Sequence, residues 1–126
     1  MLLQLCGDVA IGDTGGSAPF RPERHPVARD PALREQGYPA YLLAEAFAQI
    51  ACRTARAGDP RDRRVLPVRI TGLVADQPIP SDQAHTLEAR PLRSQPLAEF
   101  ACRLVDPCGH PLASATVTVA PAESTP

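Results

Sequence analysis

The stretch that decides the fold is PAYLLAEAFAQIACRTARAG, residues 39–58. Alanine and leucine, both strong helix formers, dominate it; a proline can occupy the first turn, and a glycine can end the helix. The helix is apolar on nearly all sides, with Glu45 and Gln49 one turn apart on a single face. The pattern predicts a buried helix, and such a helix needs other elements wrapped around it.

The segments after this helix are predicted to form the strands that wrap around it. Strand patterns separated by turn-forming sequences cover residues 65–74, 84–92, 97–105 and 112–119. The last of these alternates apolar and polar residues, which is typical of an antiparallel strand with one buried face. The order of one helix followed by consecutive antiparallel strands predicts an α+β fold.

The segment before the helix is less regular. We expect a strand over residues 2–11 and a turn-rich loop over residues 12–17. Repeated prolines between residues 19 and 39 exclude a regular helix or a central strand, so this part should be a wrapping connection. A chain of 126 residues suits one domain, expected over residues 1–120, with residues 121–126 as a flexible tail.

Composition narrows the class of partner. The formal net charge of −1 predicts no general attraction to nucleic acid or to an anionic membrane. The short apolar start, residues 1–6, has no basic region before it and is soon interrupted by Asp8, so we expect neither a signal peptide nor a membrane span, and a cytoplasmic protein. The four cysteines form no CxxC pair, which predicts reduced thiols and no metal site.

Two sequence segments resemble the bacterial 3-hydroxyacyl-carrier-protein dehydratases, which have the hotdog fold. Residues 39–49, PAYLLAEAFAQ, are similar to the family's helix start, with its carboxylate followed one turn later by Ala-Gln. Residues 77–83, QPIPSDQ, are similar to its Pro-Val-x-Pro-Gly-Asp turn. The resemblance spans residues 39–119 and implies an antiparallel sheet wrapped around one long central helix.

The resemblance fails at one place. The family's catalytic histidine precedes the helix at a spacing that corresponds here to Pro31, and His25 lies six residues further upstream. Residues 31–39 look closer to the divergent dehydratase-like proteins of aryl-polyene pigment pathways. The implied function is dehydration of a 3-hydroxyacyl thioester in fatty acid, polyketide or aryl-polyene biosynthesis, with no cofactor beyond the phosphopantetheine that carries the substrate.

Dehydration needs a base for the α-proton, an acid for the leaving hydroxyl and donors for the enolate oxygen. Glu45 is the candidate acid, because desolvation on an apolar helix would favour its neutral, proton-donating form. His25 is the candidate base. The backbone N–H groups of Ala40 and Tyr41 at the helix start are candidate donors. Gln49 could orient the carboxylate or the substrate, or it could be satisfied within a subunit interface.

The remaining candidates concern the substrate carrier and assembly. Arg53, Arg56, Arg61, Arg63 and Arg64 could bind an acidic acyl carrier protein, although helix capping and pairing with Asp59 and Asp62 is the favoured explanation of this cluster. We also expect at least a homodimer or a heterodimer with another hotdog dehydratase. Glu45 would come from one chain and His25 from the other, on opposite sides of an acyl tunnel lined by Tyr41, Leu42 and Phe47.

Two other functions stay open from the sequence. One is an acyl thioesterase, which would use the helix carboxylate and water without that histidine. The other is a non-catalytic subunit that binds acyl chains or completes a heterodimer with an active dehydratase.

Overall fold

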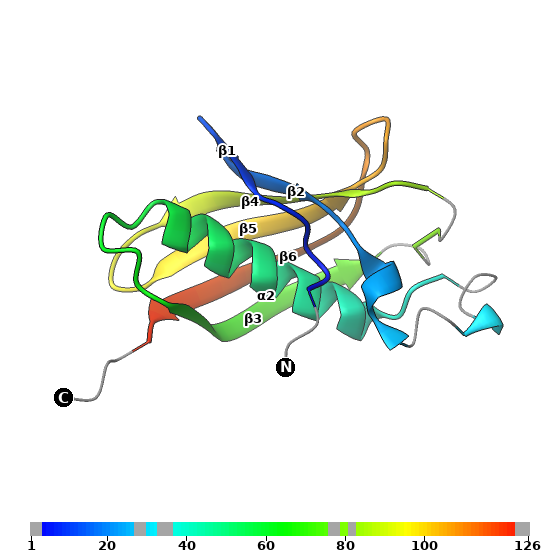
Figure 1. Cartoon of the computed structure of the whole chain (residues 1–126), viewed down its shortest axis with the longest axis horizontal. Helices are drawn as coiled ribbons and strands as arrows, with labels where there is room; N and C mark the ends of the chain where they lie inside the picture. The colour runs from blue at the N-terminus through cyan, green and yellow to red at the C-terminus, as the bar shows by residue number, and fades with distance from the viewer. Residues whose placement is uncertain (1–3, 27–29, 33–36, 76–78, 81–82, 123–126) are drawn as a thin grey trace.

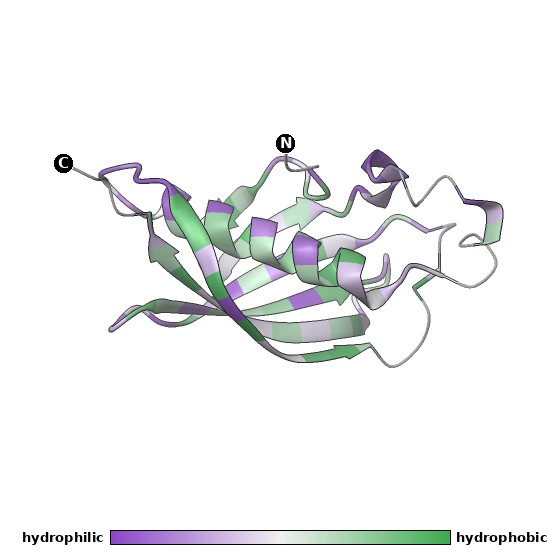
Figure 2. Cartoon of the chain, turned by 90° about the horizontal axis from the view of Figure 1, so that it is seen from below, coloured by the Kyte–Doolittle hydropathy of each residue, from purple (hydrophilic) through white to green (hydrophobic). Residues whose placement is uncertain are grey.

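A computed structural model describes residues 4–26, 30–32, 37–75, 79–80 and 83–122. One long helix, α2 (Ala40–Ala57), lies across a six-stranded antiparallel sheet that curves around it (Figures 1 and 2). The strands are β1 (Ala10–Gly12), β2 (Gly15–Pro19), β3 (Val65–Ala75), β4 (Thr86–Arg93), β5 (Ala98–Val105) and β6 (Pro111–Pro121). The predicted α+β architecture is therefore confirmed.

The helix and the four strands after it lie close to their predicted positions. Pro39 is the N-cap of α2, and the N–H of Gly58 at its end donates to the carbonyls of Thr54 and Arg56. Strand β6 continues to Pro121, and the N–H of Ala122 donates to the carbonyl of Arg64 at 2.8 Å. The sheet therefore extends into the segment that the sequence suggested would be a tail.

The N-terminal prediction was wrong in detail. Residues 2–3 of the strand expected over residues 2–11 lie outside the described residues, and of the rest residues 10–11 belong to β1. The glycine-rich segment expected as a loop forms the β1–β2 hairpin instead. Glycine is needed at position 16, where a Cβ would lie only 2.2 Å from the Oγ1 of Thr54 on α2. The missing side chain lets β2 lie directly against the helix.

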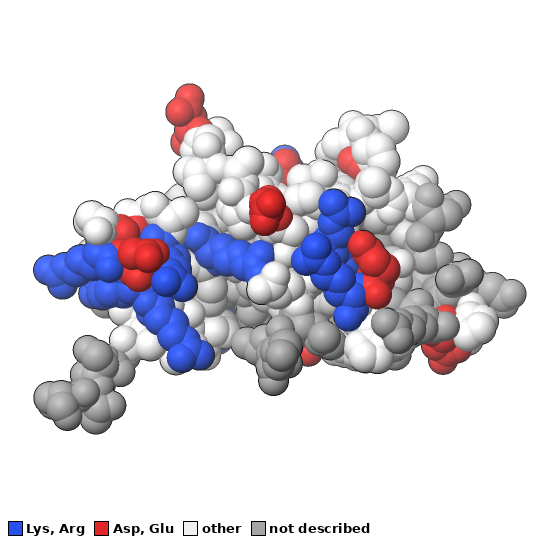
Figure 3. Space-filling model, in the orientation of Figure 1, with Lys and Arg blue, Asp and Glu red and all other residues white. Residues whose placement is uncertain are grey.

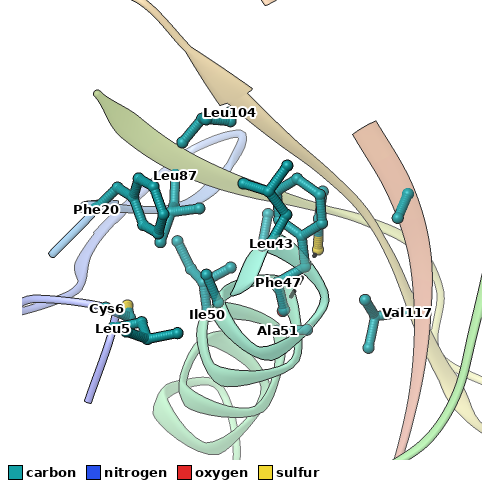
Figure 4. Close-up of a cluster of buried hydrophobic side chains, with 14 of the residues drawn as sticks. Leu5, Cys6, Phe20, Leu43, Phe47, Ile50, Ala51, Leu87, Leu104 and Val117 are labelled. Carbon is teal, nitrogen blue, oxygen red and sulfur yellow. Dashed lines mark hydrogen bonds between the residues drawn. The ribbon is translucent and has the colours of Figure 1, made fainter. Parts of the chain in front are cut away.

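The core lies between α2 and the concave face of the sheet. Leu43, Phe47, Ile50 and Ala51 of the helix point toward sheet residues such as Leu87, Leu104 and Val117, as Figure 4 shows. Leu5, Cys6 and Phe20 close the other flank of the helix (Figure 4). Burial of these apolar side chains is the main force that holds the helix in the sheet.

The order of strands in the sheet is β1-β2-β4-β5-β6-β3. Strand β3, the first after the helix, thus pairs with β6 and forms an edge. Three large apolar side chains of this edge strand are exposed, Leu66 (44%), Val68 (57%) and Val74 (51%). Such an edge offers unpaired backbone groups and apolar surface to a second strand.

In the described part of the chain, no helix has the length and apolar character needed to cross a membrane.

Candidate functional site

His25 and Glu45 face each other beside the N-terminal half of α2. The short 3-10 helix η1 (Pro22–Arg24) ends at His25, whose backbone N–H donates to the carbonyl of Pro22 at 2.9 Å. The imidazole Nε2 lies 3.9 Å from a carboxylate oxygen of Glu45, and the ring meets that of Tyr41 edge-on with centroids 6.1 Å apart. The fold thus brings together the acid and base candidates, which are 20 positions apart in the sequence.

Two expectations of the sequence analysis concern this pair in a dimer, and the single chain shows where its residues lie without a partner. The pair was expected to be divided between two chains, but one chain supplies both residues. Glu45 was expected to be desolvated, yet its side chain is 49% exposed in the single chain, while that of His25 is 19% exposed. Glu45 lies on the side of α2 away from the sheet, so a single chain leaves the carboxylate accessible to water.

The first turn of α2 presents backbone donors near this pair. The N–H of Leu42 donates to the carbonyl of Pro39 at 3.1 Å, which leaves the N–H groups of Ala40 and Tyr41 without an acceptor among the described residues. These groups carry the positive end of the helix dipole. Their use as donors to an anionic oxygen of a substrate stays a prediction.

Gln49 and Arg53 have a role that the sequence analysis did not identify. The side-chain oxygen of Gln49 accepts the backbone N–H groups of Leu5 and Cys6, at 2.8 and 3.1 Å. The guanidinium of Arg53 donates to the carbonyls of Cys6 and Gly7, at 2.7 and 3.1 Å. The two side chains tie the N-terminal segment across the helix. This use differs from substrate binding for Gln49 and from carrier-protein binding for Arg53.

Residues 5–7 and their two anchors are more than 40 positions apart. No local pattern links such distant positions. The only signal in the sequence is the presence of long polar side chains on a helix that is otherwise apolar.

The expected acyl tunnel is not seen in the described part of the single chain. Leu42 and Phe47 are fully buried in the core, and Tyr41 is exposed beside His25. Two surface hollows formed by described residues, of about 610 and 460 Å³, do not include any of these three residues. Lining of a tunnel by Tyr41, Leu42 and Phe47 therefore stays a prediction for an assembled or ligand-bound form.

The arginine cluster surrounds the far end of α2. Basic side chains gather over the end of the helix and the next loop, with acidic side chains among them (Figure 3). Arg56 pairs with Asp62 and Arg63 with Asp59, each at 2.8 Å, as the favoured explanation required. The side chains of Arg61 and Arg64 have no acidic partner among the described residues. Among the described residues of this cluster, Arg61 and Arg64 thus stay available for a carrier protein, whereas Arg53 binds backbone carbonyls.

The two segments that carry the family resemblance lie side by side. The backbone N–H of Tyr38, just before the helix, donates to the carbonyl of Ile79 at 3.2 Å. Ile79 is buried, so the turn is anchored next to the helix start. Residues 76–78 and 81–82, which include the motif's Ser81 and Asp82, lie outside the described residues.

The surroundings of the other two histidines and of the cysteines indicate structural roles for these residues. His85 is buried at the start of β4, and the exposed His110 lies 3.5 Å from Asp106 in the β5–β6 hairpin. Burial raises the pKa of Cys52 to about 11 and that of Cys102 to about 12. All four cysteines are free, and thiols with such raised pKa values are poor nucleophiles at neutral pH.

Comparison with known proteins shows which solved structures share this architecture. No family model and no curated protein matches the sequence, whereas many solved structures match the fold. They include a hot-dog-like protein from Thermanaerovibrio acidaminovorans, with 17% identity, a TM-score of 0.62 and coverage of 87% of this chain and 84% of that one.

Two further matches carry functional names. Thioesterase HI1161 of Haemophilus influenzae has 12% identity and a TM-score of 0.68, with coverage of 89% of this chain and 76% of that one. The dehydratase heterocomplex ApeI:P of Xenorhabdus doucetiae has 14% identity and a TM-score of 0.61, with coverage of 98% and 84%. At such low identity these matches establish the architecture alone. The chain has the hotdog fold.

Proposed function

We propose that the protein acts on acyl thioesters and dehydrates a 3-hydroxyacyl group carried on phosphopantetheine. The observation that carries this proposal is the approach of His25 and Glu45 to 3.9 Å beside the N-terminus of α2. At this separation the two side chains can reach substituents on adjacent carbon atoms of one substrate.

Each step has a candidate group. The imidazole of His25 removes a proton from the α-carbon, and the electron pair forms the new double bond as the β-carbon releases its hydroxyl. The carboxyl of Glu45 protonates that hydroxyl, so water leaves and a 2-enoyl thioester remains. The N–H groups of Ala40 and Tyr41 stabilise the negative charge that develops on the thioester oxygen.

A second copy of the chain would complete this site. Helix α2 packs against β3, so a partner that pairs along the exposed β3 edge would also lie beside the helix. Its presence near Glu45 would exclude water from the site, as dehydration needs. An edge strand with three exposed apolar side chains supports a homodimer as the working unit.

A thioesterase is the second candidate, and one observation favours it. The carboxylate of Glu45 is half exposed in the single chain, so water can reach it. A carboxylate that activates water would release a free acid from an acyl thioester.

One experiment separates these functions. The protein is incubated with a 3-hydroxyacyl carrier protein, and mass spectrometry follows either loss of water or release of the free acid. We expect loss of water, reduced by about 10²- to 10⁴-fold in both Glu45→Gln and His25→Gln. Glu23→Gln and His110→Gln are matched controls, because they make the same changes at exposed positions outside the pair.

Release of free acid that depends on Glu45 would replace dehydration with hydrolysis. If neither product forms at high protein concentration, a non-catalytic subunit that binds acyl chains or pairs with an active dehydratase becomes the better explanation.

A further inference from the structure

The face of the sheet opposite α2 has a hollow of its own. It has a volume of about 610 Å³ and runs from the β1–β2 turn across the central strands to Gly72 in β3. Its size falls in the usual range of small-molecule sites, about 300–1,000 Å³. Seven side chains that line it carry a hydroxyl group or a charge, namely Thr14, Ser17, Glu88, Arg90, Arg103, Ser114 and Thr116.

Short side chains create this hollow. The register places Arg90 on β4 opposite Ala101 on β5, and Ala101 opposite Thr116 on β6. Successive strand residues point to opposite faces, so these three share the outer face while their neighbours enter the core. The methyl group of Ala101 leaves space between the guanidinium of Arg90 and the hydroxyl of Thr116.

The charges in the hollow are unbalanced. The guanidinium of Arg103 is held by the carboxylate of Glu88 on the adjacent strand. The exposed Arg90 has no acidic partner among the described residues, although it lies on the same face. The hollow thus contains two guanidinium groups and one carboxylate, which leaves one positive charge beside the hydroxyl groups of Ser114 and Thr116.

We propose that this hollow binds a small organic anion through its carboxylate or phosphate group. Arg90 supplies a fork of donors for the anionic oxygens, and the hydroxyl of Thr116 donates from across Ala101. The Glu88–Arg103 pair limits the net charge, so the site suits an anion of low charge. This site is separate from the His25–Glu45 pair, because the sheet lies between them, and it does not depend on the proposed dehydration.

The test is an NMR titration of the full chain with inorganic phosphate and, separately, with acetate, at constant ionic strength. We expect saturable shifts of the amide signals of Ala101, Ser114 and Thr116. Arg90→Gln should weaken the binding by about tenfold or more. Thr116→Val keeps the charge and the shape and should weaken it by a smaller factor. Arg21→Gln, which removes an exposed charge elsewhere, should leave the binding unchanged.

The titrations with phosphate and with acetate identify the class of ligand. Saturation by phosphate alone indicates a phosphate ester, saturation by acetate alone indicates a carboxylic acid, and saturation by both indicates a general anion site. The proposal is overturned if neither anion saturates these signals, or if Arg90→Gln and Arg21→Gln have the same effect.

Discussion

Gln49 holds the N-terminal segment through one oxygen atom that accepts two backbone N–H groups. Gln49→Ala would leave both donors without this partner, and we expect the free energy of unfolding to fall by about 1–3 kcal/mol. Urea unfolding followed by circular dichroism measures this loss. Gln83→Ala removes the same side chain at an exposed position and should change the stability by less than about 0.5 kcal/mol. Equal effects of the two variants would contradict the tethering role.

The buried thiols predict a dependence of stability on alkaline pH. The pKa values of Cys52 and Cys102 in the folded chain, about 11 and about 12, exceed the ordinary value of 9.0 because burial disfavours the thiolate. Above pH 9 the unfolded chain therefore loses thiol protons that the folded chain keeps. The stabilisation is complete below pH 9 and is lost as the pH rises toward about 12. The sequence has no lysine, so few other side chains titrate in this range.

Urea unfolding at about pH 8 and about pH 10.5 tests this expectation. The decrease in the free energy of unfolding between the two pH values should be smaller in Cys102→Ala than in the unchanged chain. Cys108→Ala, at an exposed position, is the matched control and should retain the full decrease. A decrease of equal size in Cys102→Ala would show that this thiol does not carry the effect.

The resemblance to the dehydratases identified His25 and Glu45 as candidates, because Glu45 stands at the family's carboxylate position in the helix and His25 is a histidine that precedes the helix. The exposure of Glu45 could not be predicted in the same way. Alanines at positions 44 and 48 look apolar in a sequence, yet both are only partly buried beside it. Alanine is tolerated on both the buried and the exposed face of a helix, so the sequence of an alanine-rich helix does not indicate which face the sheet covers.

At the scale of elements, the contact of β2 with α2 depends on the absence of a side chain at position 16. Gly16→Ala would bring a Cβ to 2.2 Å from the Oγ1 of Thr54, and overpacking of this kind costs about 1–3 kcal/mol of stability. We expect Thr54→Ala to relieve most of this loss, because it removes the Oγ1 at 2.2 Å and the Cγ2 at 3.1 Å and leaves only the Cγ1 of Val9 at 3.1 Å among the three close atoms. A double-mutant cycle on thermal or urea unfolding measures the coupling. Additive effects of the two substitutions would rule out this contact as the cause.

The same contact explains why the first strands were not predicted. Glycine is usually unfavourable within a strand, so a run of glycines beside serine and alanine indicates a loop. Here the requirement for close packing on the helix outweighs that preference. The later strands follow local alternation between a buried and an exposed face, and for this reason their positions could be predicted from the sequence.

For the whole molecule, we expect a homodimer that forms along β3. Val68→Asp places a charge on the exposed edge and should convert the dimer to a monomer in sedimentation equilibrium. Leu92→Asp makes the same kind of change at an apolar residue of similar exposure on β4 and should leave the dimer intact. A monomer before substitution, at micromolar concentration, would contradict the proposal.

The position of β3 at the edge next to β6 also has a consequence for synthesis on the ribosome. Residues 65–75 are made before their partner strand, residues 111–121, and strands β4 and β5 are made between the two. Strand β5 also pairs with β6, so it too lacks one neighbour until that point. While translation continues, the nascent chain carries unpaired strands that are open to misassociation. Loss of residues 111–121 would therefore leave β3 and β5 without the strand that joins them.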